Sequence, residues 1–76
     1  MNAETIGRNA LRLWQTMNNG TIWCYNKLRQ ASQLSDFELN AAIGWLARED
    51  TIEIALDPVS NTETYQVRHF WDMAGL

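Results

Sequence analysis

Apolar side chains recur at helical spacing in the middle of the chain. This stripe consists of Leu39, Ala42, Ile43 and Leu46. Their spacing of i, i+3, i+4 and i+7 places them on one face of an α-helix. Ser35 and Glu38 have the spacing of a capping box, in which each side chain accepts a hydrogen bond from the other residue's backbone N–H. The sequence therefore predicts a helix that begins just after Ser35.

The period changes from helical to alternating after Glu49-Asp50. Apolar and polar residues then alternate over Thr51–Leu56, which is typical of a strand with one buried face. The segment 57–61 contains Pro58, which fixes φ and cannot donate to a ladder, so it predicts a turn. Alternation resumes over Thr62–Arg68. The helix is therefore expected to run directly into a β-hairpin.

Two further helices are predicted before the central one. The first covers Ala3–Asn18. Gly20 follows it and is suited to the left-handed conformation that often ends a helix. A short extended piece follows at 21–23, and the second helix covers Tyr25–Ser32. The predicted elements agree in having one buried face each, so these faces should share one core. The expected core is Ile6, Ala10, Leu13, Trp14, Met17, Trp23, Leu28, Ala31, Leu34, Leu39, Ile43, Leu46, Ile52, Ile54, Tyr65 and Val67.

The length of 76 residues predicts a single domain over 1–76, with residues 69–76 as an aromatic C-terminal tail. The chain has no apolar run near the ~20 residues of a membrane span, and its start lacks the pattern of a signal peptide. One cysteine permits no internal disulfide. We therefore expect a cytoplasmic protein that does not insert into membranes.

The net charge of −3 conceals two regions of opposite sign. Residues 1–34 carry one acidic side chain, Glu4, against Arg8, Arg12, Lys27 and Arg29. Residues 35–67 carry seven acidic side chains against Arg48 alone. The central helix and the hairpin are therefore expected to be acidic.

The predicted order is helix, short strand, helix, turn, helix, strand, loop, strand, and it resembles the winged helix-turn-helix fold over about residues 3–68. The most specific part is AIGWLAREDTIEI, residues 42–54, which is similar to a recognition helix passing into the first strand of a wing. The string GWLARED resembles a group of small, stand-alone bacterial winged-helix proteins of unassigned function. The resemblance implies an α+β fold of three helices with a small antiparallel sheet.

The resemblance also implies DNA binding through the central helix and the wing, but the charges oppose it. Only Asn40 and Arg48 on that helix belong to the usual base-reading side chains. The segment 57–62 has no Lys or Arg to neutralise phosphates, which supply most non-specific affinity. Duplex DNA is therefore possible but disfavoured, and Arg8, Arg12, Lys27 and Arg29 would be its other contacts.

A protein-binding role uses residues at helical spacing away from the core stripe. They are Phe37, Ala41, Gly44, Trp45 and Arg48. Trp45 and the tail residues Phe70 and Trp71 are of the kinds that anchor interfaces. In the alternative interpretation, Trp45 packs under the tail or wing of its own chain. The partner would be an unknown basic protein or a second copy, whose positive first half docks head to tail on the acidic half.

Nothing in the sequence has the pattern of a catalytic, metal or cofactor site, and no small-molecule substrate is evident. Cys24 is at the expected N-cap of the second helix, where it more simply replaces Ser than acts as a nucleophile. His69 is the only histidine, and with Asp72 it offers at most a weak metal pair. Tyr25 with the basic side chains could bind single-stranded nucleic acid, although a solvated helix face is the simpler interpretation. We therefore expect a protein without catalytic activity or cofactor.

Overall fold

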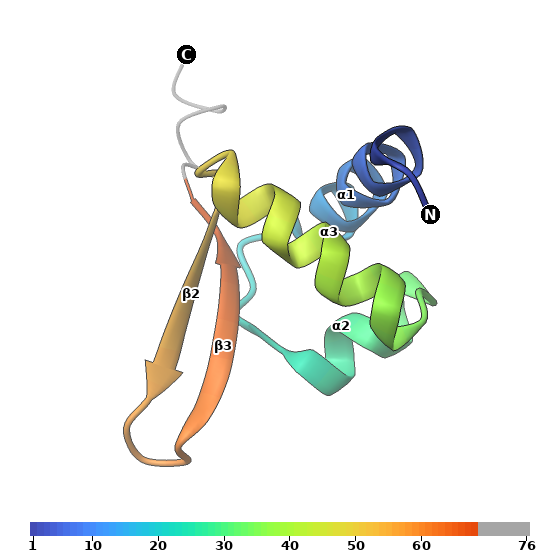
Figure 1. The fold of residues 1–76 in the computed structure, drawn as a ribbon. Coiled ribbons are helices and arrows are strands. Elements are labelled where there is room, and N and C mark those ends of the chain that lie inside the picture. The colour runs from blue at the N-terminus through green and yellow to red at the C-terminus, as the bar shows by residue number, and fades with distance from the viewer. Residues whose placement is uncertain (69–76) are drawn as a thin grey trace.

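The computed structural model describes residues 1–68, in which three helices gather on one side of an antiparallel sheet (Figure 1). The helices are α1 (Ala3–Met17), α2 (Tyr25–Ser32) and α3 (Asp36–Arg48). The strands are β1 (Trp23–Cys24), β2 (Ile52–Asp57) and β3 (Thr62–Val67), in the order β1-β3-β2. The predicted α+β arrangement is confirmed for these residues.

The start of α3 has the predicted capping box. The Ser35 hydroxyl accepts from the Glu38 N–H at 3.2 Å, and Glu38 Oε1 accepts from the Ser35 N–H at 2.9 Å. Two donors that a helix end leaves without intrahelical partners are thus satisfied. The local sequence therefore fixes where α3 begins.

The turn between α2 and α3 is short because Gln33 adopts the left-handed conformation with a φ of 60°. Its N–H donates to the Arg29 carbonyl at 3.0 Å, and the next N–H, of Leu34, donates to the Ser32 hydroxyl at 3.3 Å. Ser32 is buried, and this hydrogen bond gives its hydroxyl a partner. The sequence prediction placed Ala31 inward instead, and this is wrong: Ala31 is exposed, because the inner line of α2 runs from Leu28 to Ser32.

The hairpin leaves the helical layer soon after it begins. Ile52 lies opposite Val67, and both are buried under the helices. Two residues later, Ile54 lies opposite buried Tyr65 on the same face, yet Ile54 is 42% exposed. The prediction that Ile54 belongs to the core is therefore wrong, because the hairpin extends past the helices (Figure 1).

Most other predicted core residues are buried. Ile6, Trp14 and Trp23 are only partly buried, and Ala42 belongs to the core although the expected core omitted it. The central cluster is Ala10, Leu13, Met17, Leu28, Leu34, Leu39, Ala42, Ile43, Leu46, Ile52, Tyr65 and Val67. This cluster joins all three helices to the end of the hairpin that lies opposite its turn. The fold thus holds α3 and the wing in a fixed relation to each other.

Candidate interaction surface

The solvent face of α3 carries an apolar and small-residue stripe. Phe37 is 72% exposed, and Ala41 and Gly44 follow it at helical spacing. A Cβ built on Gly44 meets no atom within 4 Å, so the space over it is open within the described residues. Arg48 is exposed at the end of the same line. We call Phe37, Ala41, Gly44 and Arg48 the α3 stripe.

Trp45 does not belong to this stripe, although the sequence grouped it there. Its ring lies against α1, 3.5 Å from where a Cβ on Gly7 would stand, and it is 37% exposed. A shallow apolar groove surrounds this contact, lined by Gly7, Ala10, Leu11, Trp14, Trp45, Leu46 and Thr51. Trp45 therefore packs on α1 of its own chain, whereas the alternative interpretation named the tail or the wing. Phe70 and Trp71 lie outside the described residues.

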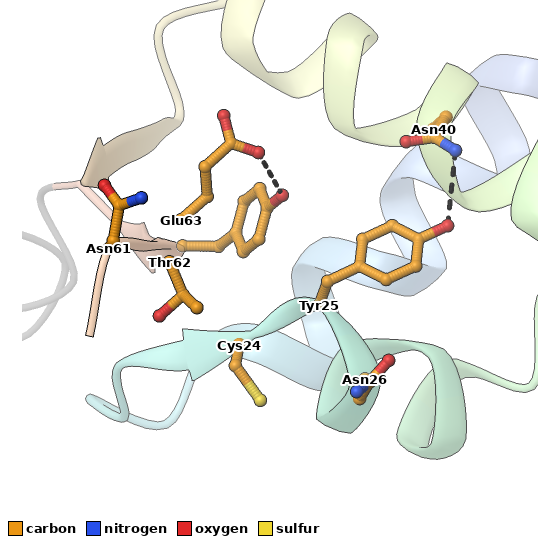
Figure 2. A pocket seen from close by; sticks show the side chains of 8 residues that line it. Cys24, Tyr25, Asn26, Asn40, Asn61, Thr62 and Glu63 are labelled. Carbon is orange, nitrogen blue, oxygen red and sulfur yellow. Dashed lines mark hydrogen bonds between the residues drawn. The ribbon is translucent and has the colours of Figure 1, made fainter. Parts of the chain in front are cut away.

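A cleft of about 770 Å³ opens beside the α3 stripe, between α3, the start of α2 and β3 (Figure 2). It is lined by Cys24, Tyr25, Asn26, Asn40, Asn61, Thr62, Glu63 and Tyr65. Asn40 connects the two surfaces, because it lies on α3 three residues after Phe37 and four before Gly44. Glu63 is the one acidic side chain in the lining, and no Lys or Arg lines the cleft.

A hydrogen-bond network organises one wall of the cleft. The Tyr25 hydroxyl donates to Asp36 Oδ1 at 2.7 Å, and Arg29 Nε pairs with the same oxygen at 3.2 Å. The amide nitrogen of Asn40 donates to the Tyr25 hydroxyl at 3.2 Å and to the Asp36 carbonyl at 2.8 Å. Figure 2 shows the Asn40–Tyr25 contact. Both N–H bonds of the Asn40 side-chain amide thus have acceptors within the same chain.

The two tyrosines both have raised pKa values, for different reasons. The hydrogen bond to the Asp36 carboxylate is the main cause for the pKa of Tyr25. Burial is the main cause for the pKa of Tyr65, followed by the negative charge of Glu63, whose Oε1 accepts from the Tyr65 hydroxyl at 3.2 Å. Both phenols therefore stay protonated at neutral pH and can donate hydrogen bonds to these carboxylates.

The basic side chains of the first half are partly neutralised within the chain. Arg8 pairs with Glu4 at 3.2 Å on α1, and Arg29 pairs with Asp36 across the helix-turn-helix. The pKa of Glu38 is lowered mainly by the Ser35 N–H and hydroxyl, with a smaller contribution from the charge of Arg12. Lys27 is exposed on α2. These contacts weaken the positive face on which head-to-tail docking would depend.

Among residues 1–68, the remaining candidate is Cys24. Cys24 is half-buried at the N-cap of α2, and its side chain makes no cap hydrogen bond. In the part of the chain that the structure describes, no three His, Cys, Asp or Glu side chains gather as metal ligands would. None of the helices within residues 1–68 is long and apolar enough to cross a membrane. His69 and Asp72 lie outside the described residues.

The sequence patterns did not predict the cleft, because the residues that form the walls of the cleft are far apart in the chain. Asp36 and Asn40 are four residues apart, and that spacing could have shown that they share a helix side. Tyr25 and Tyr65 are brought together only by the pairing of β1 with β3, in which Trp23 lies opposite Tyr65. No local pattern specifies that pairing.

Comparison with known proteins identifies a family for this chain. A model described as a winged helix-turn-helix domain (DUF2582) matches residues 1–66. The chain is also similar to a protein from Bacteroides thetaiotaomicron solved by solution NMR, with 25% sequence identity and a TM-score of 0.81. That similarity covers 95% of this chain and 85% of the other. None of the curated proteins matches.

Proposed function

The chain belongs to the DUF2582 family of winged helix-turn-helix domains, and we propose that it is a non-enzymatic regulatory or adaptor module that binds protein in preference to duplex DNA. A winged helix domain of this kind can bind DNA or protein, so its fold alone does not choose between them. The choice rests on the side chains that α3 and the wing present to a partner.

The observation that carries the proposal is the composition of the α3 stripe. A recognition helix reads DNA with side chains that donate to or accept from base edges. Here Phe37 and Gly44 are exposed with half-buried Ala41 between them, and the amide of Asn40 is already bonded to Tyr25 and Asp36. Arg48 is the one base-reading side chain left on this face.

The wing adds a second argument. Residues 52–67 contain Glu53, Asp57 and Glu63 but no Lys or Arg. Phosphate neutralisation supplies most non-specific affinity for DNA, and carboxylates repel phosphates instead. A protein partner meets no such obstacle. The surface suits a partner with an apolar side chain for the α3 stripe and a Lys or Arg for the cleft beside Glu63.

Fluorescence anisotropy on a random-sequence duplex tests the proposal against DNA binding. We expect affinity weaker than the ~10⁻⁴–10⁻⁶ M typical of non-specific binding at physiological salt. The triple variant Glu38→Gln, Glu53→Gln, Asp57→Asn should bind more tightly, because it removes repulsion and keeps the oxygen acceptors for the cap and the turn. Tight binding with a steep negative salt slope, lost in Arg48→Ala, would instead establish the DNA-binding regulator.

The cleft can be tested separately with small probes. N-acetyl-arginine amide should shift the NMR signals of Tyr25 and Tyr65, whereas the neutral citrulline analogue of the same shape should not. Glu63→Gln should weaken the arginine response, because it removes the one charge in the cleft lining. Equal responses to arginine and citrulline would show that the cleft does not select a basic side chain.

A further inference from the structure

We propose that two copies of this chain pair through the outer edge of β2 and form one continuous antiparallel sheet. Within residues 1–68, β2 pairs with β3 on one side only, so its other edge has no partner. Ile54 and Leu56 on this strand are 42% and 59% exposed. An exposed apolar edge strand is a template for a further strand.

The hydrogen bonds of the hairpin show which residues face this edge. Continuing the register one step past Ile52 and Val67 places Thr51 opposite Arg68, and the Arg68 N–H donates to the Thr51 carbonyl at 2.9 Å. Antiparallel strands alternate residues that bond to a given neighbour with residues that do not. The odd-numbered residues of β2 therefore point their backbone groups at β3. Ile52, Ile54 and Leu56 point theirs at the outer edge.

One register matches these three residues with themselves in a second copy. A two-fold axis at Ile54 places it opposite its own equivalent and places Ile52 opposite Leu56 of the other copy. Each such pair has the orientation to exchange both backbone hydrogen bonds, and the central pair is the most open, since Ile54 is 42% exposed and Ile52 only 4%. A shift of two residues in one direction puts Ile52 opposite Pro58, which has no N–H to donate. The opposite shift puts Leu56 opposite Asp50, whose φ of 60° is not that of a strand.

The same register joins the apolar side chains and separates the charges. Paired residues lie on one face of a sheet, so Ile54 meets Ile54, and Leu56 meets Ile52. Glu53 lies opposite Ala55 rather than opposite another carboxylate. The two Glu53 side chains are diagonal neighbours, roughly 7–8 Å apart by general sheet geometry. Their repulsion is weak and falls with salt.

The strand has few of the features with which proteins protect an edge. Its register with β3 runs unbroken from Ile52 to Asp57, so it contains no bulge. It contains no Lys and no Pro, and its single solvent-facing charge in mid-strand is Glu53. Natural edges are usually blunted by such devices. The opposite edge strand, β1, covers only Trp23–Cys24 and offers far less backbone.

Sedimentation of the intact chain at high protein concentration tests the proposal. We expect a monomer–dimer equilibrium in which raising salt increases the dimer fraction, whereas head-to-tail docking of opposite charges would weaken with salt. Ile54→Lys should abolish the dimer. Val59→Lys should not, because Val59 is 94% exposed in the hairpin loop outside the paired residues. A monomer at every salt concentration, or a dimer unchanged by Ile54→Lys, would overturn the proposal.

Cross-linking tests the register even if Ile54→Lys fails to fold. In a Cys24→Ser background, the Ile54→Cys variant should oxidise to a covalent dimer, because directly opposite Cα atoms lie about 5.5 Å apart, within the range of a disulfide. The Leu56→Cys variant should not, since its equivalents are four residues out of register, roughly 13 Å apart. Equal cross-linking of the two variants would exclude this two-fold axis.

Discussion

Replacing Ser35 with Ala should destabilise the fold by about 1 kcal/mol, the usual cost of losing an N-cap acceptor. The Ser35 hydroxyl accepts from the Glu38 N–H at 3.2 Å, and alanine has no atom that can replace it. A chain of this length has a free energy of unfolding of roughly 4–11 kcal/mol. The loss is therefore large enough to measure and too small to unfold the protein.

Thermal and urea denaturation measure this loss. At about 1 kcal/mol the midpoint temperature should fall by roughly 4–8 °C for a domain of this size. Ser35→Asp should keep most of the stability, because Asp is an equally good cap. Ser60→Ala is a matched control, since Ser60 is exposed in the hairpin loop and caps no helix; its hydroxyl contacts the Thr62 hydroxyl at 2.6 Å and the Asp57 side chain. Equal losses for Ser35→Ala and Ser60→Ala would refute the role of the cap.

The reciprocal half of the box can be separated with Glu38→Ala. Glu38 Oε1 accepts from the Ser35 N–H at 2.9 Å, and this contact should survive in Ser35→Ala because it uses the backbone. A double-mutant cycle over the two positions measures their coupling. A destabilisation by Glu38→Ala in both backgrounds would establish a true capping box. No effect in either would leave Ser35 as a cap acting alone.

Three further predictions concern stability. Leu13→Ala should cost about 2–5 kcal/mol by urea denaturation, because Leu13 is fully buried and leaves a cavity; a loss below that range would show that the site can collapse. Backbone N–H groups hold the pKa values of Glu38 and Asp57 below 4.5 and 3.8, their ordinary values. The stability that these two carboxylates contribute is complete above about pH 4.5 and is lost as the pH falls through their lowered pKa values. Urea midpoints measured from pH 6 to 3 should therefore fall less steeply for the Glu38→Gln, Asp57→Asn variant than for the unmodified protein. Gly44→Ala should stabilise α3 by about 0.5–1 kcal/mol, since the new Cβ enters open space; a lower midpoint temperature would show that something covers the α3 stripe.

Local patterns in the sequence predicted the parts of the fold that depend on nearby residues. The capping box, the buried stripe of α3 and the change to a hairpin after Asp50 each follow from spacing within a few residues. These signals are strong because propensity, capping and burial agree. They sufficed to place α3 next to the wing.

The sequence could not predict where the core ends or which surfaces meet. Alternation put Ile54 on the correct face of β2 but did not show that the helices stop short of it. Helical spacing grouped Trp45 with Phe37, but in the structure the Trp45 ring packs against α1 instead of lying on the exposed stripe. The cleft required Tyr25 and Glu63 to meet across a pairing of distant strands. These features depend on tertiary packing, which no local pattern records.

The two proposed surfaces are compatible because they use different parts of the fold. Edge pairing of antiparallel strands keeps the core faces of both sheets on one side, so the helical layers of both copies would also share that side. Each copy would then keep its α3 stripe and cleft open, and the dimer would present two equivalent binding faces. A partner with two matching sites would gain avidity from this arrangement. Ile54→Lys should then weaken binding of a two-site partner while leaving a one-site partner unaffected, and equal loss for both would show that Ile54 itself contacts the partner.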